Sequence, residues 1–182
     1  MSTKHTKRAA SRTADTAHAI GAIGANADQT TPGGMVANDL QYRVTRTAVR
    51  EFEQALVRLD ETEAHRSPEM RALMRSAMES QLDDLRQQMS EYEALRAGRV
   101  RVLELESLEE LPDVLIRARI AAGLTQKELA GRLGMRESQL QRYEASRYAG
   151  ASLARLQAVA DALGAQTHGR IVLADAAHAS GR

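Results

Sequence analysis

The amino-acid sequence predicts a mainly all-α protein with one or two short β-strands. Apolar residues recur at helical spacing over most of the chain between its two ends. Aromatic residues make up only 3% of the sequence and Trp is missing, so the core must be built from Leu, Ala, Val, Ile and Met. Such a core suits packed helices better than a β-sandwich, and 182 residues suffice for one or two small domains.

Residues 1–37 are predicted to form a disordered N-terminal tail. The segment is rich in Ala, Thr, Ser and Gly, has no Leu, and includes only two Ile. It therefore buries too little apolar surface to offset the entropy lost when a chain is ordered. Ordered-looking sequence begins just after Met35, so Met1 and Met35 both remain open as the translation start.

Residues 38–98 are predicted to form a helical hairpin used for dimerisation or partner binding. From Thr45 onward, apolar residues follow one face of a helix: Val49, Phe52, Leu56 and Leu59. Pro68 suits the first turn of a second helix, with Ser67 as its N-cap, and this helix is predicted to run to about Ala97.

Residues 99–110 are predicted to hold a short strand and a linker. Gly98 ends the preceding helix, and β-branched residues alternate in the strand predicted at Arg99–Glu106. The letters SLEE, Ser107–Glu110, then match a capping box for a helix that starts at Pro112 and runs to about Ala121.

The stretch LTQKELAGRLGMRESQLQRYEAS, Leu124–Ser146, predicts two helices that meet through a tight turn. Gly134 supplies the positive φ that such a turn needs, and Ala130 is small where the two helices approach each other. Four residues are spaced to face inward: Leu129, Leu133, Leu140 and Tyr143. This pattern indicates a helix-turn-helix, whose second helix lies in the DNA major groove. An ordinary helical corner with solvated polar residues is the alternative.

The charge of the chain is divided between its two halves. Residues 45–110 hold 10 basic and 15 acidic residues, whereas residues 111–170 hold 9 basic and 5 acidic residues. The basic half, which contains the helix-turn-helix, is therefore the candidate for binding nucleic acid. We assign residues 111–165 to a DNA-binding domain, and residues 166–182 to a short strand (Arg170–Asp175) and a disordered C-terminal tail.

Three stretches between Arg117 and Gly164 resemble the five-helix, lambda-repressor-like DNA-binding domain of the Xre family (phage repressor and Cro-like): RARIAAGLTQKELAGRLGM, QLQRYEAS and SLARLQAVADALG. The resemblance implies that Gln126 bonds a DNA phosphate. It also implies that four residues at the start of the second helix, and one turn into it, read bases: Glu137, Ser138, Gln141 and Arg142. It further implies an internal ion pair between Arg119 and Glu144.

Two positions depart from the pattern of that family. Arg136 stands at the cap position of the second helix, where Ser or Thr is usual, and its side chain cannot accept hydrogen bonds from the first amides. We expect Arg136 to contact phosphate instead. Ser146 stands where a Gly usually follows the second helix. Lys127 and Arg147 complete the expected DNA-binding set.

The wider architecture resembles HigA-type antitoxins and orphan Xre regulators, through NDLQYRVTRTAVREFEQAL and EYEALRAG. The expected function is a sequence-specific transcriptional repressor that binds double-stranded operator DNA as a cytoplasmic, nucleoid-associated homodimer. The dimer seam is expected in the hairpin or in the predicted strands. The alternative is the antitoxin of a type II toxin–antitoxin pair, in which the N-terminal helices bind a toxin.

No enzymatic activity, cofactor or metal is expected. The sequence has no Cys, and its five His are scattered without acidic partners at ligand spacing: His5, His18, His65, His168 and His178. No nucleophile motif and no phosphate-binding glycine loop is present in the sequence. No run approaches the roughly 18 apolar residues that a membrane span requires.

Overall fold

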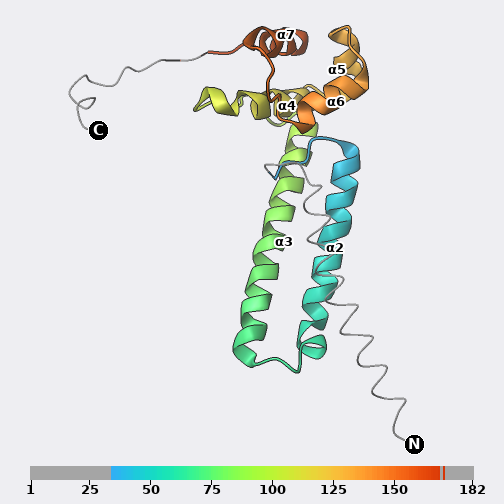
Figure 1. Ribbon diagram of the computed structural model, residues 1–182, viewed down its shortest axis with the longest axis vertical. Helices are drawn as coiled ribbons and strands as arrows, with labels where there is room; N and C mark the ends of the chain where they lie inside the picture. Colours follow the sequence, from blue (N-terminus) through green and yellow to red (C-terminus); the bar gives the residue numbers. More distant parts are fainter. Residues whose placement is uncertain (1–33, 169, 171–182) are drawn as a thin grey trace, which may run out of the picture.

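The computed structural model describes residues 34–168 and residue 170, and every regular element within them is a helix. Figure 1 shows a long hairpin of two helices with the remaining helices gathered at one of its ends. In chain order the elements are α2 (Asp39–Thr62), α3 (Pro68–Arg96), the 3₁₀ turn η1 (Leu108–Glu110), α4 (Leu111–Ala121), α5 (Gln126–Arg132), α6 (Glu137–Ala145) and α7 (Leu153–Leu163). The predicted all-α class is confirmed. Of the five helices implied for the DNA-binding domain, the described residues contain four α-helices, preceded by η1.

Helix α2 begins six residues before the position where the apolar pattern begins. Its N-cap is Asn38, whose side chain accepts a hydrogen bond from the amide of Gln41 over 2.9 Å. The pattern missed this first turn and a half because Leu40 and Val44 point into solvent. Helix α3 begins at Pro68 as predicted, and the hydroxyl of its cap accepts from the third amide of the helix over 3.3 Å.

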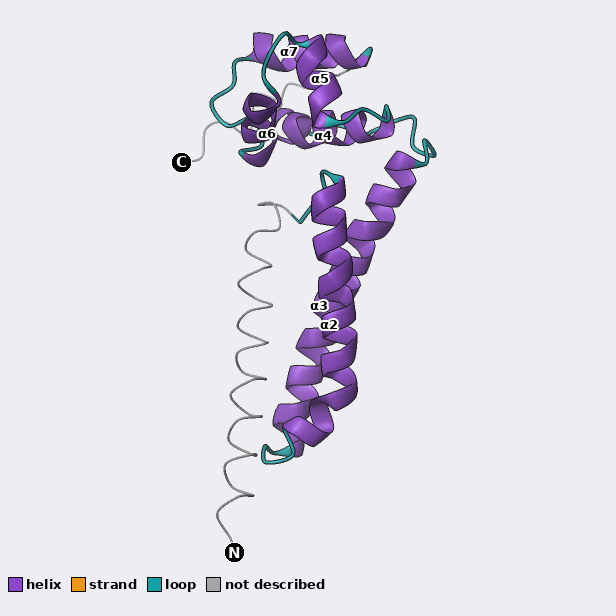
Figure 2. Ribbon diagram, turned by 90° about the vertical axis from the view of Figure 1, so that its right-hand side faces the viewer, coloured by secondary structure: helices purple, strands orange, loops and turns teal. Residues whose placement is uncertain are grey.

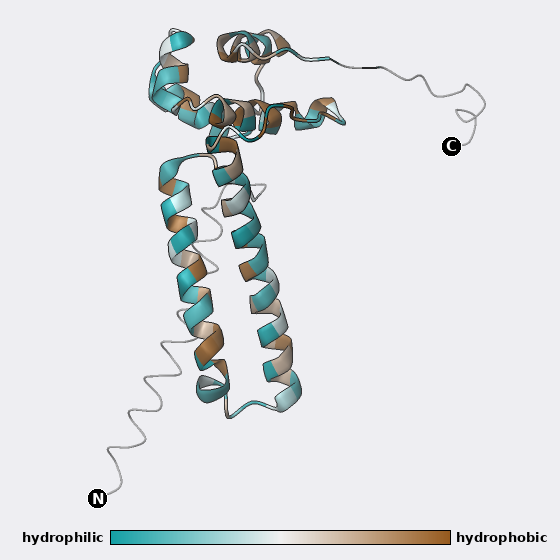
Figure 3. Cartoon of the chain, turned by 180° about the vertical axis from the view of Figure 1, so that it is seen from behind, coloured by the Kyte–Doolittle hydropathy of each residue, from teal (hydrophilic) through white to brown (hydrophobic). Residues whose placement is uncertain are grey.

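The hairpin has a narrow apolar core between α2 and α3. One cluster there has three buried residues with four more packed around them: Val49, Leu82 and Leu85, then Ala48, Phe52, Leu56 and Met89. Leu59 and Met78 are also buried on these two helices. Ion pairs join the helices at the rim, from Arg75 to Asp60 and from Arg86 to Glu53, over 2.8 and 2.7 Å. Figure 3 shows that hydrophilic residues predominate along both helices, with hydrophobic residues interspersed.

The strand predicted at Arg99–Glu106 is wrong. This segment is a loop, and no strand is drawn among the described residues in Figure 2. Val100 and Leu103 pack against the main core while Val102 is 73% exposed, so the inward residues do not alternate. Without a neighbouring strand to accept its backbone hydrogen bonds, the segment cannot form a ladder. The second predicted strand, 170–175, lies outside the described residues except for Arg170, which has no regular structure.

The capping box predicted at Ser107–Glu110 does not form. The Ser107 side chain makes no capping hydrogen bond, and Glu110 accepts instead from the backbone amide of Glu106 over 3.1 Å. The reason is the intervening 3₁₀ turn, which places Glu110 at the N-cap of α4 rather than inside its first turn. Pro112 does lie in the first turn of α4, and the helix ends at Ala121 as predicted.

The main core joins the hairpin to the helices above it. Its fully buried residues come from the segment before α2, the end of α3, and α4 to α7: Val36, Ala37, Tyr92, Leu95, Leu115, Ile116, Ile120, Leu129, Ala130, Leu140, Tyr148, Val159 and Ala160. One cooperative core therefore fixes the hairpin against the four short helices. None of the helices in the described part of the chain is long and apolar enough to cross a membrane.

The last residues of the segment assigned to a disordered tail are packed into this core. Val36 is 1% exposed and Ala37 is 4% exposed. The backbone carbonyl of Ala37 accepts a hydrogen bond from Nη2 of Arg119 over 2.7 Å. Composition averaged over 37 residues concealed the single valine that anchors this short arm. Residues 1–33 lie outside the described part of the chain.

Candidate nucleic-acid interface

Helices α5 and α6 meet through the turn that the sequence predicted. Gly134 has a φ of +65°, in the left-handed region, where glycine is favoured. Ala130 is 1% exposed, and Leu129 and Leu140 are both 0% exposed, so the inner angle between the helices is fully packed. Leu133 is also packed against this core, although it is only partly buried.

The start of α5 is fixed by a capping box that sequence reasoning missed. The Thr125 hydroxyl accepts from the amide of Glu128 over 3.2 Å, and the Glu128 carboxylate accepts from the amide of Thr125 over 2.8 Å. The amide and the hydroxyl of Thr125 both donate to this carboxylate, and these two hydrogen bonds hold the pKa of the Glu128 carboxyl below its usual value. The signal was present as a threonine followed three residues later by a glutamate.

The start of α6 lacks the usual side-chain cap, because Arg136 occupies the cap position. Only the reciprocal bond of a capping box is formed there by a side chain: Oε1 of Gln139 accepts from the amide of Arg136 over 3.0 Å. The Arg136 guanidinium is left exposed and makes no ion pair with any described residue. An unpaired positive charge thus lies at the N-terminus of α6, where the helix dipole already favours anions.

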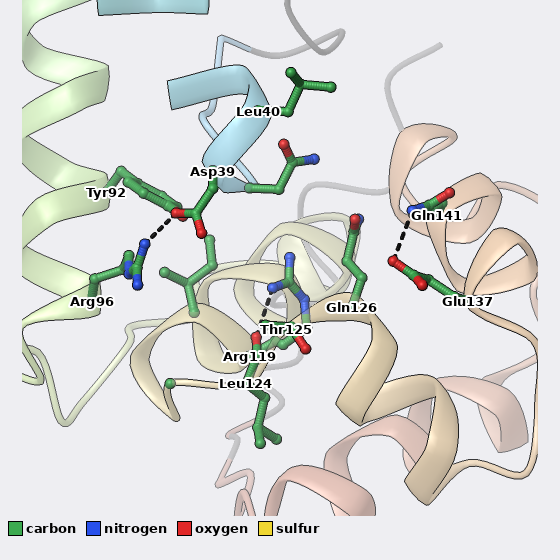
Figure 4. Close-up of a pocket in the computed structure, with 13 residues that line it drawn as sticks. Asp39, Leu40, Tyr92, Arg96, Arg119, Leu124, Thr125, Gln126, Glu137 and Gln141 are labelled. Atoms are coloured by element: carbon green, nitrogen blue, oxygen red, sulfur yellow. Dashed lines mark hydrogen bonds and ion pairs between the residues drawn. The ribbon is translucent and has the colours of Figure 1, made fainter. Parts of the chain in front are cut away.

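The outer face of α6 carries the four residues expected to read bases, and all are exposed: Glu137, Ser138, Gln141 and Arg142. Gln141 donates to Glu137 over 3.2 Å, one turn apart on the same face (Figure 4). Arg142 has no side-chain partner among the described residues, and neither has the exposed Lys127 on α5. The face therefore offers both donors and acceptors to a ligand.

Arg119 and Glu144 form a buried ion pair beneath this face. Nε and Nη2 of Arg119 donate to the two carboxylate oxygens of Glu144 over 2.6 and 2.7 Å. Nη1 donates to the carbonyl of Leu124 over 2.9 Å. Because both side chains are almost fully buried, the pair fixes α4 and α6 relative to each other.

Gln126 begins α5, as expected, but its side chain is held by the ion pair. Its Nε2 donates to Oε2 of Glu144 over 2.8 Å, and the residue is half-buried. The buried glutamate thus orients the side chain that is expected to bond a phosphate. Such support from a second layer of residues is typical of a pre-organised site.

Arg147 does not present a free guanidinium. Its Nε donates to Asp113 on α4 over 2.7 Å, and a second bond joins the same two side chains. Both Arg147 and Tyr148 have positive φ, at 49° and 54°, whereas Ser146 does not. The chain thus turns after α6 through two non-glycine residues in the left-handed region, which is strained for residues other than glycine.

The first turns of α2 and α6 border the same depression, a cavity of about 300 Å³ (Figure 4). It is lined by the start of α2, the ends of α3 and α4, the turn that follows α4, and the starts of α5 and α6. Among its lining residues are Leu40, Gln126, Glu137 and Gln141. The hairpin therefore contributes to the surroundings of the predicted reading face, which sequence reasoning did not anticipate.

Polar contacts hold the side chains in place on the hairpin side of this depression. Asp39 accepts a hydrogen bond from the Tyr92 hydroxyl over 2.8 Å and is paired with Arg96. The Arg96 guanidinium also lies over the Tyr92 ring, 5.9 Å from its centroid. Burial, followed by the bond to Asp39, raises the pKa of Tyr92.

Comparison with known proteins agrees with this geometry. Residues 115–168 match the family model described as helix-turn-helix, which covers α4 from Leu115 onward together with α5, α6 and α7. Neither the curated proteins nor the solved structures gave a significant match to the chain. Residues 115–168 therefore form a DNA-binding helix-turn-helix domain of the Xre type.

Proposed function

We propose that this protein is a transcriptional repressor that recognises a specific operator through α6. The observation that carries the proposal is the set of four exposed polar residues on the outer face of α6, within a matched helix-turn-helix domain. Exposed side chains that do not help to hold the core together are free to bond base edges in the major groove. A protein bound there excludes other proteins from the same DNA.

The expected contacts divide into two groups. Arg142 and Gln141 lie on α6 where side chains reach base edges, and a guanidinium there can donate two parallel bonds to guanine. Lys127 and Arg136 carry free charges at the starts of the two helices, where the DNA backbone passes. Gln126 adds a neutral donor to phosphate, oriented by Glu144.

We also propose that the protein binds DNA as a homodimer. One helix-turn-helix reads only a few base pairs, and a two-fold protein matches a two-fold operator. The far half of the hairpin supplies the seam in this proposal, because it carries three exposed large apolar side chains: Val57, Met70 and Leu73. A monomeric mass in light scattering at micromolar concentration would argue against a dimer.

The test is a gel shift with the purified full chain and the DNA upstream of its own gene. The expected result is a discrete complex at nanomolar protein that survives an excess of unrelated DNA. Footprinting should then reveal two related half-sites one or more helical turns apart. Equal binding to the upstream DNA and to scrambled DNA would rule out a specific operator there.

The second candidate is an antitoxin of a type II pair that represses its own operon. The observation that favours it is the hairpin itself, which projects away from the DNA-binding helices (Figure 1) and ends in exposed apolar residues such as Leu73. Co-expression separates the two candidates. A neighbouring gene that arrests growth unless this chain is present supports the antitoxin, and its absence supports the repressor alone.

A further inference from the structure

Three arginines in the first half of α2 share one face of the helix. Arg43, Arg46 and Arg50 are spaced by three and four residues, and all three are exposed. None of them makes an ion pair or a side-chain hydrogen bond within residues 34–168. Their charges are therefore not used to hold the fold together.

The other arginines of the hairpin are engaged by neighbours. Those of the two helices and the connecting turn bond to Gln54, Glu63, Asp60, Glu53 or Asp39: Arg58, Arg66, Arg71, Arg75, Arg86 and Arg96. The carboxylate nearest the start of α2, Asp39, is already neutralised by Arg96. The hairpin is acidic as a whole, yet the part next to the DNA-binding helices has unpaired positive charge.

This positive face continues the surface expected to bind DNA. Leu40 in the first turn of α2 lines the same 300 Å³ cavity as Gln126 and Glu137 (Figure 4). A duplex that accepts α6 in its major groove must therefore pass beside the start of α2. From Arg43 to Arg50 the helix rises about 10 Å, which equals about three base pairs of one DNA strand.

We propose that the arginine face of α2, formed by Arg43, Arg46 and Arg50, binds phosphates of the DNA that flanks the half-site read by α6. The inference rests on the proposed function and extends it, because the hairpin becomes a second DNA contact. Arginine on an exposed helix is suited to phosphate, which it binds without reading sequence. The far half of the hairpin remains available for the dimer seam.

The experiment compares a triple variant, Arg43→Ala with Arg46→Ala and Arg50→Ala, with the control Arg58→Ala on the same helix. Binding of the full chain is measured on a long operator, on an operator trimmed to its half-sites, and on scrambled DNA. We expect the triple variant to lose at least about tenfold in affinity on the long operator. The slope of log K against log salt should fall by about 0.9 for each lost contact.

Three further readouts identify the cause of the loss. The triple variant should lose as much on long scrambled DNA as on the long operator, because phosphate contacts carry no sequence information. It should match wild type on the trimmed operator, and replacement of the three arginines by Lys should restore most of the affinity. Thermal unfolding should be unchanged, since exposed substitutions cost little.

The outcomes that overturn the inference differ from those that overturn the function. If wild type binds the operator specifically but the triple variant behaves as Arg58→Ala does, the arginine face does not bind DNA. A loss confined to binding of an acidic partner protein would have the same meaning. A wild-type chain that binds no DNA would overturn the proposed function together with this inference.

Discussion

The guanidinium of Arg119 and the carboxylate of Glu144 form two parallel hydrogen bonds in the interior of the DNA-binding domain, over 2.6 and 2.7 Å. The remaining donors of Arg119 bond the carbonyls of Ala37 and Leu124, and Glu144 also accepts from Gln126. One ion pair thus joins α4 and α6 to the arm before α2, and it orients the first residue of α5.

We predict that Glu144→Ala lowers the free energy of unfolding by about 3–5 kcal/mol. The substitution leaves a buried guanidinium without its counter-charge, and the cost of that exceeds the net value of the pair. Glu137→Ala is the control, because it removes an exposed glutamate from the same helix and should change stability by less than about 0.5 kcal/mol. Urea unfolding measures both, and a midpoint for Glu144→Ala equal to that of wild type would contradict the prediction.

The arm before α2 provides a second prediction about stability. Val36 is 1% exposed in the main core, whereas Val57 is 84% exposed on the hairpin. Val36→Ala should therefore cost about 2 kcal/mol, from lost burial and a residual cavity. Val57→Ala removes the same atoms from the surface and should be nearly neutral. Similar unfolding midpoints for the two variants would show that the arm does not anchor the hairpin in solution.

The helix-turn-helix could be predicted from sequence because its determinants are local. Ala130 lies in the first helix and Gly134 in the turn directly after it, and the apolar residues around them follow the helical period. The start of α3 was readable for the same reason, since Ser67 and Pro68 act on adjacent amides. The ion pair of Arg119 was implied only by resemblance, because 25 residues separate it from Glu144.

The features that sequence could not predict depend on contacts between distant segments. Nothing local indicates that Ala37 would accept a bond from Arg119, 82 residues away. The alternation around Val100 imitates a strand, yet a strand exists only if another lies beside it. The arginine face of α2 was hidden by the acidic average of the hairpin, because the pairing of the other arginines appears only in three dimensions.

Tyr148 yields a prediction that combines stability with pH. The residue is 3% exposed, and its hydroxyl has no hydrogen-bond partner among the described residues. Burial, and then the charge of Glu144, raises the pKa of Tyr148 above its ordinary value of 10.0. Tyr148→Phe should be neutral or stabilising by up to about 1 kcal/mol at neutral pH, because it removes an unsatisfied buried group.

The sign of the pH effect follows from proton binding. Above about pH 10 the unfolded chain releases the tyrosine proton, whereas the folded chain retains it, so stability falls as pH rises. Tyr148→Phe lacks this term and should lose less stability between about pH 9 and pH 11. Urea unfolding of both proteins at several pH values measures the difference. Parallel curves would mean that the hydroxyl ionises equally in both states.

The last prediction separates sequence reading from charge on α6. Arg142 is exposed within the reading face, whereas Arg136 lies at the start of the helix, nearer to the expected phosphates. Arg142→Ala should lose about 1–3 kcal/mol of binding free energy on the operator and little on scrambled DNA, because two bonds to guanine are removed. Arg136→Ala should lower the affinity for both DNAs alike, and it should reduce the slope of log K against log salt by about one unit.

Glu137 makes this comparison sharper, because its carboxylate repels phosphate but accepts from the amino group of cytosine. Its contact with Gln141 holds the carboxylate on the reading face. Glu137→Gln should therefore broaden the range of bases tolerated at one position. It should also raise the affinity for scrambled DNA, because the repulsion of phosphate is removed. Titration of the three variants on operator and scrambled DNA at several salt concentrations measures these effects. Equal losses on both DNAs for Arg142→Ala would remove that residue from the base-reading set, and the specificity would then have to come from Gln141 and Ser138.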